Sequence, residues 1–198
     1  SLPSEPSTSL PATSLPVSSG SGGDGQFLQL GQKGVGLMNL VQQNFWVPEQ
    51  QKALERRGQD SPAYLWPYGS YLEALAAVCK ANPADQSVRQ NYMEALAGVE
   101  NYNTRREAPG LSYAAAFGGG GDVYYDDNMW IAIAYLKAYN NLKDPAYLAK
   151  SRQVAAYCYS GWDDVQGGGI YWCENQKTSK NTCSNAPMAM VSADLFAA

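Results

Sequence analysis

The chain has 198 residues, a formal net charge of −4 at pH 7 and no histidine. This length is enough for one domain with its own core, and the mild acidity argues against a nucleic-acid partner, which would require a basic patch. Without histidine, Ser-His and Cys-His nucleophile systems and most zinc sites are excluded, so proton transfer has to use carboxylates, tyrosine or lysine, and we expect no metal or cofactor.

The first 25 residues are rich in Ser, Thr and Pro and then in Gly and Ser. A segment with so little apolar surface cannot bury enough of it to become ordered. We therefore predict a disordered linker or stalk over residues 1–25, of the kind found on secreted proteins, with a remnant of an expression tag as the alternative. The folded domain is expected to cover residues 26–198.

A weak helical pattern over residues 27–44 opens the folded part, although glycines interrupt it. Pro48 then favours the start of a short polar helix that ends near Gly58. No later segment is apolar over a length that could cross a bilayer, so we expect no transmembrane segment.

Two kinds of helix alternate in the rest of the chain. One kind is apolar on all sides, which is typical of buried helices, and the other carries a single apolar stripe, which is typical of surface helices. The apolar kind is predicted over 69–81, 128–142 and 186–198, and the striped kind over 85–102 and 145–159. We infer an all-α fold, an α/α toroid with an inner ring of buried helices inside an outer ring, whose inner helices open with their N-terminal ends onto one cleft.

Residues 161–185 separate the last two helices and are too polar and Gly-rich for a helix. Ile170, Tyr171 and Trp172 predict a short strand there, as half of a β-hairpin-like loop. Because the segment ends just before an inner helix, we expect it to lie at the cleft.

The stretch FGGGGDVYYDDNMW, residues 117–130, contains two adjacent carboxylates, Asp126 and Asp127. Paired carboxylates are the working groups of glycoside hydrolysis. Neighbouring residues of a helix point about 100° apart, so both can reach one substrate only where a loop turns into a helix, and the glycines before the pair supply that junction. The alternative is a structural one, in which Asp caps the helix and a second Asp suits the helix dipole.

The four cysteines form no C-x-x-C motif, which argues against a zinc ribbon or a thioredoxin motif. An even number in an apparently secreted chain favours two disulfides. We predict Cys173–Cys183, closing a short polar loop, and Cys79–Cys158, joining two helices. Four buried free thiols are the alternative.

Several motifs together carry a family likeness: YDDNMW at 125–130, GGGIYW at 167–172, Lys180-Asn181 followed by Ser184-Asn185, and LWPY at 65–68. Over about residues 28–198 the sequence resembles glycoside hydrolase family 76, the α-1,6-mannanases with an (α/α)6 barrel. A twelve-helix barrel requires roughly twice this chain, so the resemblance implies the N-terminal half. A half-barrel would expose an apolar edge, through which we expect association.

The resemblance implies a retaining mechanism with Asp126 as nucleophile and Asp127 as acid/base, whereas the residues alone do not tell which Asp does which. A retaining enzyme needs the two carboxyls about 5–5.5 Å apart, and a neighbouring carboxylate would raise the pKa of the acid. The remaining candidates for binding sugar hydroxyls or stacking on sugar rings, with core packing as the alternative for the aromatic ones, are Tyr125, Asn128, Trp130, Trp66, Tyr68, Lys180, Asn181 and Asn185.

The function expected from this resemblance is hydrolysis of α-1,6-mannosidic bonds in mannan polysaccharide or oligosaccharide by a secreted or cell-wall-associated enzyme. Three alternatives stay open: a mannan transglycosylase of the cell wall, a non-catalytic carbohydrate-binding or structural fragment, and an unrelated helical-repeat interaction protein.

Overall fold

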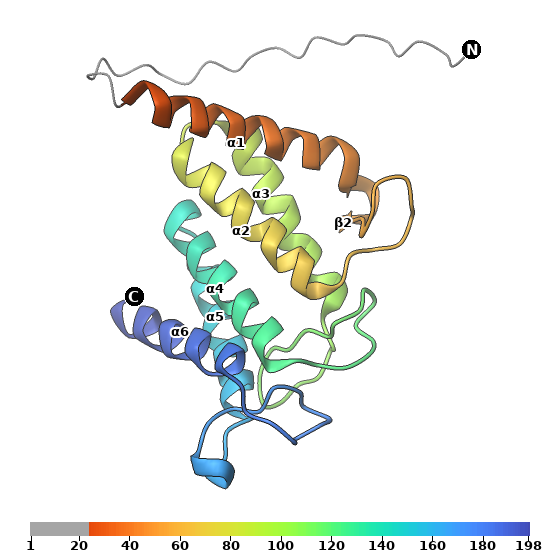
Figure 1. The fold of residues 1–198 in the computed structure, drawn as a ribbon, viewed down its shortest axis with the longest axis vertical. Coiled ribbons are helices and arrows are strands. Elements are labelled where there is room, and N and C mark those ends of the chain that lie inside the picture. Colours follow the sequence, from red (N-terminus) through yellow and green to blue (C-terminus); the bar gives the residue numbers. More distant parts are fainter. Residues whose placement is uncertain (1–23) are drawn as a thin grey trace.

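The computed structural model describes residues 24–198, so the predicted linker lies almost entirely outside the described residues (Figure 1). The described part is built mainly of helices, and the all-α prediction is confirmed. The six α-helices are α1 (Asp24–Phe45), α2 (Leu65–Ala81), α3 (Gln86–Gly98), α4 (Tyr125–Leu142), α5 (Pro145–Tyr159) and α6 (Ala186–Ala197). None of these helices combines the length and the apolar character that crossing a bilayer requires.

Helix α4 lies at the centre of the structure and packs against α2, α5 and α6. Helices α2 and α4 run in the same direction in Figure 1, with α3 packed on α2 and α5 packed on α4. For α2 to α5 this is the predicted alternation, because α2 and α4, which are apolar all round, lie inside and the striped helices cover them. The prediction that α6 is also buried on all sides is wrong: it packs against α4 and α5, but only its residues Met188 and Val191 are buried. Ten of the residues of α4 are buried, which follows from apolar side chains on every side of it.

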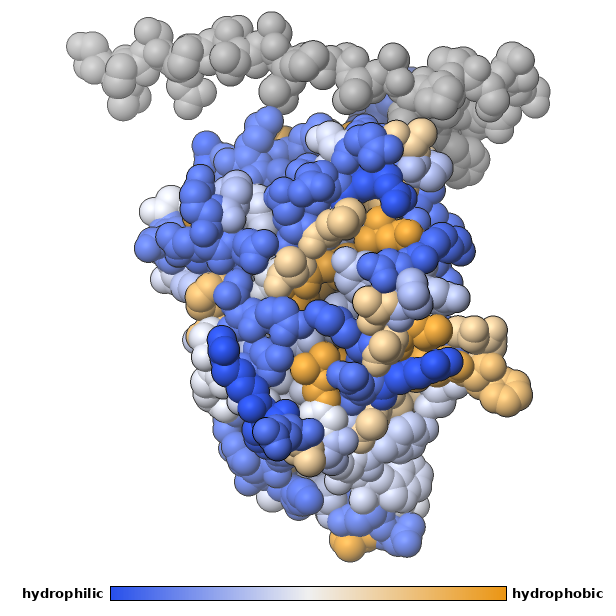
Figure 2. All heavy atoms as spheres, turned by 180° about the vertical axis from the view of Figure 1, so that it is seen from behind, coloured by the Kyte–Doolittle hydropathy of each residue, from blue (hydrophilic) through white to orange (hydrophobic). Residues whose placement is uncertain are grey.

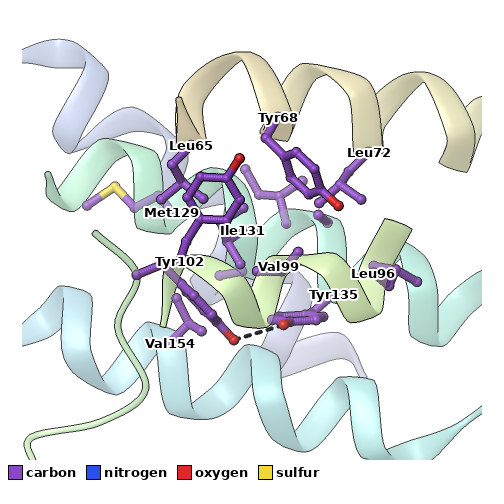
Figure 3. Packing of buried hydrophobic residues seen from close by; sticks show 14 of the residues in the cluster. Leu65, Tyr68, Leu72, Leu96, Val99, Tyr102, Met129, Ile131, Tyr135 and Val154 are labelled. Carbon is purple, nitrogen blue, oxygen red and sulfur yellow. Dashed lines mark hydrogen bonds between the residues drawn. The ribbon is translucent and has the colours of Figure 1, made fainter. Parts of the chain in front are cut away.

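Tyrosines fill much of the core between α2, α3 and α4 (Figure 3). Tyr68 is fully buried and its hydroxyl donates a hydrogen bond of 2.7 Å to the Ala95 carbonyl. The Tyr135 hydroxyl shares a hydrogen bond of 2.8 Å with that of Tyr113, drawn as the dashed line at Tyr135. Buried tyrosines with partnered hydroxyls are core residues, so Tyr68 belongs to the core in this structure and does not reach a substrate surface.

The short polar helix predicted from Pro48 to Gly58 is wrong. A 3-10 turn at Pro48–Gln50 is followed by β2 (Lys52–Ala53), which pairs antiparallel with β1 (Trp46–Val47). Gln51 between them has a left-handed backbone with φ of 46°, which ends the turn. Lys52 and Ala53 are buried, so pairing and burial decide the structure here against the local helix signal from proline.

The structure describes all of residues 161–185 and forms no regular strand there, so the predicted strand at Ile170–Trp172 is wrong. The hairpin-like form arises from an isolated antiparallel bridge between Trp162 and Ile170. A 3-10 turn, η3 at Val165–Gly167, lies between these two bridge residues, and a second one, η4 at Thr182–Ser184, follows near the end of the segment. Consecutive glycines with positive φ at Gly167, Gly168 and Gly169 turn the chain between the two halves of the loop.

Both predicted disulfides are wrong, because all four cysteines are free. Cys79 lies on α2 and Cys158 on α5, and α4 packs against both of these helices. Cys158 instead hydrogen-bonds through its thiol to the Tyr125 carbonyl at 3.7 Å. Cys173 is buried, whereas Cys183 is exposed. Unpaired buried cysteines behave as small apolar side chains, so packing alone accounts for three of the four.

Apolar side chains also reach the surface in several places. On the face seen in Figure 2 they gather in patches and at a projection formed by the end of α6. Phe196 on that helix is 94% exposed, and Leu37 on α1 is also exposed. Large exposed apolar side chains of this kind mark surfaces that other protein atoms can cover.

Candidate active site

The N-terminal ends of α2 and α4 are each tied to a loop by a main-chain hydrogen bond. The Leu65 amide donates to the Ala115 carbonyl, and the Tyr125 amide donates to the Trp172 carbonyl, both at 2.9 Å. Each bond satisfies one of the free amides that begin a helix. A loop segment therefore lies at the N-terminal end of each of these two helices.

Helix α4 begins at Tyr125, three residues earlier than predicted, so Asp126 and Asp127 lie inside its first turn. The N-cap position belongs to Tyr124, whose side chain makes no capping hydrogen bond. No aspartate caps this helix, so this part of the structural alternative is wrong. Both carboxylates still sit at the positive end of the helix dipole, where negative charge is favoured.

Both carboxylate oxygens of Asp126 accept hydrogen bonds. Oδ2 accepts from the indole Nε1 of Trp172, and Oδ1 accepts from the backbone amide of Asp127, each at 3.1 Å. The Cys183 thiol lies beside the same group. Although Cys183 as a whole is exposed, partial desolvation of its sulfur, followed by a hydrogen bond to Asp126 and by the charge of Asp126, raises the pKa of that thiol. Asp126 is therefore a carboxylate held in one orientation.

Asp127 has a different environment. Burial, and secondly the charge of Asp126, raise its pKa from 3.8 to about 7. Within residues 24–198 its carboxyl group accepts no hydrogen bond from another residue, so nothing offsets the cost of burying its charge. Asp127 consequently keeps its proton up to about neutral pH, which is what a general acid requires.

An aromatic pair lies next to the two aspartates. The ring of Trp172 packs on that of Tyr124 with centroids 4.8 Å apart, and 38% of Trp172 is exposed. Neither residue was among the sequence-based candidates, nor was Cys183. Trp172 ends the GGGIYW motif, which carried the family likeness, but only the fold brings its indole to Asp126.

Three predicted binding residues are buried and do not reach the surface of the site. Tyr68 is one of them, because its side chain lies in the core. Tyr125 is also buried, and its ring stacks on that of Tyr157 at 5.2 Å. Asn128 is buried as well and uses its side-chain amide to hold Tyr113: Oδ1 accepts from the Tyr113 amide at 2.8 Å and Nδ2 donates to its carbonyl at 2.9 Å. In this structure all three side chains belong to the buried part of the protein and not to an exposed binding surface.

The predicted tryptophans lie closer to the surface. Trp66, in the first turn of α2, is 60% exposed and is free to stack on a ligand. Trp130, in α4, is partly buried and packs against the core.

The other polar candidates stabilise the loop of residues 161–185. Lys180 is nearly buried, and its Nζ forms an ion pair of 2.5 Å with Asp163 and donates to the carbonyl of Val165 at 2.7 Å. Asn185 accepts from the Ile170 amide at 2.8 Å and donates to the Ile170 carbonyl at 3.0 Å.

Asn181 is partly buried, and its backbone amide donates a hydrogen bond of 3.2 Å to the Ser184 hydroxyl. These three residues, Lys180, Asn181 and Asn185, therefore shape the loop that presents Trp172.

A surface cavity of about 630 Å³ lies elsewhere, at the opposite ends of α2 and α4. Its lining includes Glu73, Lys80, Lys137 and Lys143. Because the aspartates occupy the N-terminal end of α4 and this cavity its C-terminal end, the cavity is not part of the candidate site.

The family model for glycosyl hydrolase family 76 matches residues 36–198. The chain belongs to this family. No curated protein sequence matches this member of family 76, whereas several solved structures of the family are similar to it in fold.

A family 76 glycoside hydrolase from a bovine Bacteroides thetaiotaomicron strain is 26% identical with a TM-score of 0.75, over 85% of this chain and 38% of that chain. A family 76 mannosidase from B. thetaiotaomicron VPI-5482 is 21% identical with a TM-score of 0.74, over 85% and 48%. An α-1,6-mannanase from a Salegentibacter species is 24% identical with a TM-score of 0.66, over 84% and 45%. The chain thus spans less than half the length of these relatives and corresponds to part of their (α/α)6 barrel.

Proposed function

We propose that the protein is a retaining glycoside hydrolase that cleaves α-1,6-mannosidic linkages in mannan, with Asp126 as nucleophile and Asp127 as acid/base. One observation carries the proposal. Two adjacent carboxylates of a family 76 chain differ in environment, since Asp126 is fixed by two hydrogen bonds and Asp127 has a pKa raised to about 7. A carboxyl group whose pKa is raised, next to a carboxyl group that is fixed by hydrogen bonds, is the arrangement expected of a general acid and a nucleophile.

The relatives support the substrate class. The Salegentibacter structure is that of an α-1,6-mannanase, and an inactive variant of it with two consecutive aspartates replaced by asparagine is in complex with α-1,6-mannotriose. At 22–24% identity these structures share the fold with this chain, and their linkage specificity enters here as part of the proposal.

The proposed reaction has two steps. An oxygen of Asp126 attacks the anomeric carbon, the bond from that carbon to the leaving oxygen breaks, and Asp127 gives its proton to the leaving oxygen. In the second step Asp127, now ionised, takes a proton from water, the water oxygen attacks the same carbon, and the bond to Asp126 breaks. Trp66 and Trp172 are the exposed rings on which mannose units would stack.

We further propose that the protein acts outside the cell or at the cell wall, where mannan polymers occur. The Ser-, Thr- and Pro-rich composition of residues 1–25 supports this location.

The test is turnover of linear α-1,6-mannotetraose by the full-length protein, followed by NMR of the anomeric protons. The expected first product has the α configuration. Asp126→Asn and Asp127→Asn should each lower kcat by about 10³-fold or more, whereas Asp164→Asn, an exposed residue on the neighbouring loop, should stay within twofold of the wild type. A β product, or equal activity in all three variants, would refute the proposal.

The same assay separates the remaining alternatives. Longer mannosides appearing in place of mannose and shorter fragments would indicate transglycosylation, in which a sugar hydroxyl replaces water as acceptor. Binding of mannotetraose without turnover in wild type and variants alike would indicate a non-catalytic carbohydrate-binding protein.

A further inference from the structure

Trp172 joins the loop of residues 161–185 directly to Asp126 by a hydrogen bond from its indole Nε1–H to Oδ2, at 3.1 Å. The other oxygen of Asp126 already accepts the Asp127 amide. Hydrogen bonds to an ionised acceptor are the strong ones. The indole and the amide, one on each oxygen, therefore fix the plane of the carboxylate together.

The indole is itself held in place by contacts that do not involve Asp126. The Trp172 carbonyl accepts from the Tyr125 amide at 2.9 Å, and the Trp172 amide donates to the Ser179 carbonyl at 3.0 Å. Its ring rests on that of Tyr124. Main-chain bonds on both sides and ring packing on one face thus set the direction of the N–H before any substrate binds, which is the condition for a preorganised donor.

Tyr171, the residue before Trp172, also helps to fix the loop that carries the indole. The Tyr171 hydroxyl donates to Asp163 at 3.0 Å, and Lys180 binds the other oxygen of Asp163 while its ammonium lies 4.6 Å from the centroid of the Tyr171 ring. This group of three side chains closes the loop at a point next to Trp172. The loop is thereby fixed at both Tyr171 and Trp172.

We propose that Trp172 is a positioning residue of the reaction, whose indole N–H holds Asp126 for attack and stabilises its carboxylate when it leaves in the second step. This inference rests on the proposed function. During attack, the oxygen that bonds to carbon loses its charge, and when water displaces it the charge returns to the carboxylate. A fixed donor at Oδ2 lowers the cost of that returning charge. The indole transfers no proton in either step.

The variant that tests this role is Trp172→Phe, which removes the N–H and keeps a ring to pack on Tyr124. Loss of one hydrogen bond to a charged group corresponds to about a 10- to 100-fold fall in kcat, with KM changed less than about threefold because the stacking surface remains. The matched control is Trp162→Phe on the same loop. Trp162 is 52% exposed, and its indole makes no hydrogen bond to the described residues, so kcat should stay within twofold of the wild type.

A second measurement does not depend on turnover. Solvent exchange of the indole N–H protons, followed by NMR in the full-length protein, should be slower at Trp172 than at Trp162. In Asp126→Ala the Trp172 proton should exchange at least fivefold faster, because its acceptor has gone, whereas Trp162 should be unaffected.

Each outcome decides the matter. Slow exchange that depends on Asp126, together with the selective fall in kcat, supports the role. Exchange at Trp172 as fast as at Trp162 overturns it, and so does an unchanged kcat in Trp172→Phe or a change confined to KM, which would leave only a sugar-stacking role. A wild-type protein that binds but never cleaves mannan overturns the proposed function and this role with it, and is recognised by inactivity in every variant.

Discussion

Asn128 and Tyr113 form a two-way hydrogen bond in which the side-chain amide of Asn128 pairs with both polar groups of the Tyr113 backbone, at 2.8 and 2.9 Å. Asn128 Nδ2 also donates to the Tyr124 carbonyl at 2.8 Å. The side chain is completely buried, one residue after the aspartate pair. The Asn128 side chain thus pairs with the loop backbone as a neighbouring β-strand would, and in this way it joins the loop before α4 to the helix.

Replacing Asn128 by Ala should therefore destabilise the protein strongly. The change leaves both polar groups of the Tyr113 backbone buried without these partners, and each such group costs about 1–3 kcal/mol. We expect the free energy of unfolding to fall by about 3 kcal/mol, measured by urea denaturation. Asn140→Ala, at an exposed position of the same helix, should change it by less than about 0.5 kcal/mol. Equal effects of both changes would contradict the structural role of Asn128.

The raised pKa of Asp127 makes stability depend on pH. A carboxyl whose pKa is about 7 in the folded state and near 3.8 when unfolded binds its proton more tightly when folded. The folded state is therefore favoured at low pH. The contribution of protonated Asp127 to the free energy of unfolding is lost as the pH rises from about 4 to about 7.

Asp127→Asn removes this ionisation and should flatten the dependence. We expect the variant to be more stable than the wild type at pH 8, by about 1–3 kcal/mol, and to differ much less at pH 4. Thermal unfolding of both proteins over this range tests the expectation. A wild type that gains stability relative to the variant between pH 4 and 7 would show that the pKa of Asp127 is lowered instead.

Gly161 allows Tyr125 to pack where it does. A Cβ at Gly161 would lie 2.5 Å from the Tyr125 ring, which is closer than atoms approach in proteins. Gly161→Ala should move the ring and the first turn of α4 with it, which lowers stability by about 1–3 kcal/mol and reduces activity further. At Gly120 a Cβ would meet no atom within 4 Å, so Gly120→Ala is the control and should be nearly neutral. Denaturation and kcat of both variants check this.

Lys180 is expected to keep the loop of residues 161–185 closed. Its ammonium, by hydrogen bonding, lowers the pKa of Asp163, so the stabilisation is present above the pKa of an unfolded Asp and is lost as the pH falls below the folded value. Lys180→Met should therefore speed cleavage by proteases at Gly167–Gly169 at neutral pH and have a smaller effect at acidic pH. Lys177→Met, at an exposed position nearby, should leave the cleavage rate unchanged. No difference between the two variants at neutral pH would rule out the ion pair as the closing contact.

The sequence predicts best those elements whose ends are set locally. Helix α5 has the predicted bounds because Asp144 caps it, accepting from the Ala146 amide at 2.9 Å, and Pro145 begins it. Helix α3 starts at Gln86, one residue after its predicted start, because Asp85 is its N-cap and accepts from the Ser87 and Val88 amides.

The start of α4 could not be predicted in this way. Its first amide is satisfied by the Trp172 carbonyl, which lies in a distant part of the sequence. The paired acids were visible as a motif, but the partner that fixes Asp126 was not, because no local pattern encodes a contact between the start of α4 and this loop. The buried positions of Tyr68 and Asn128 follow from tertiary packing in the same manner.

The loop that carries Trp172 meets α4 through an isolated backbone bridge between Tyr124 and Cys173. Because this bridge is made by backbone atoms, it does not depend on the side chains further along the loop. Residues 175–178 of the loop are exposed. The geometry of the two carboxylates and the exposed part of this loop are thus separately adjustable. If the proposed function holds, a library randomised at these four positions should alter which acceptor or branch is tolerated while the two carboxylates stay in place.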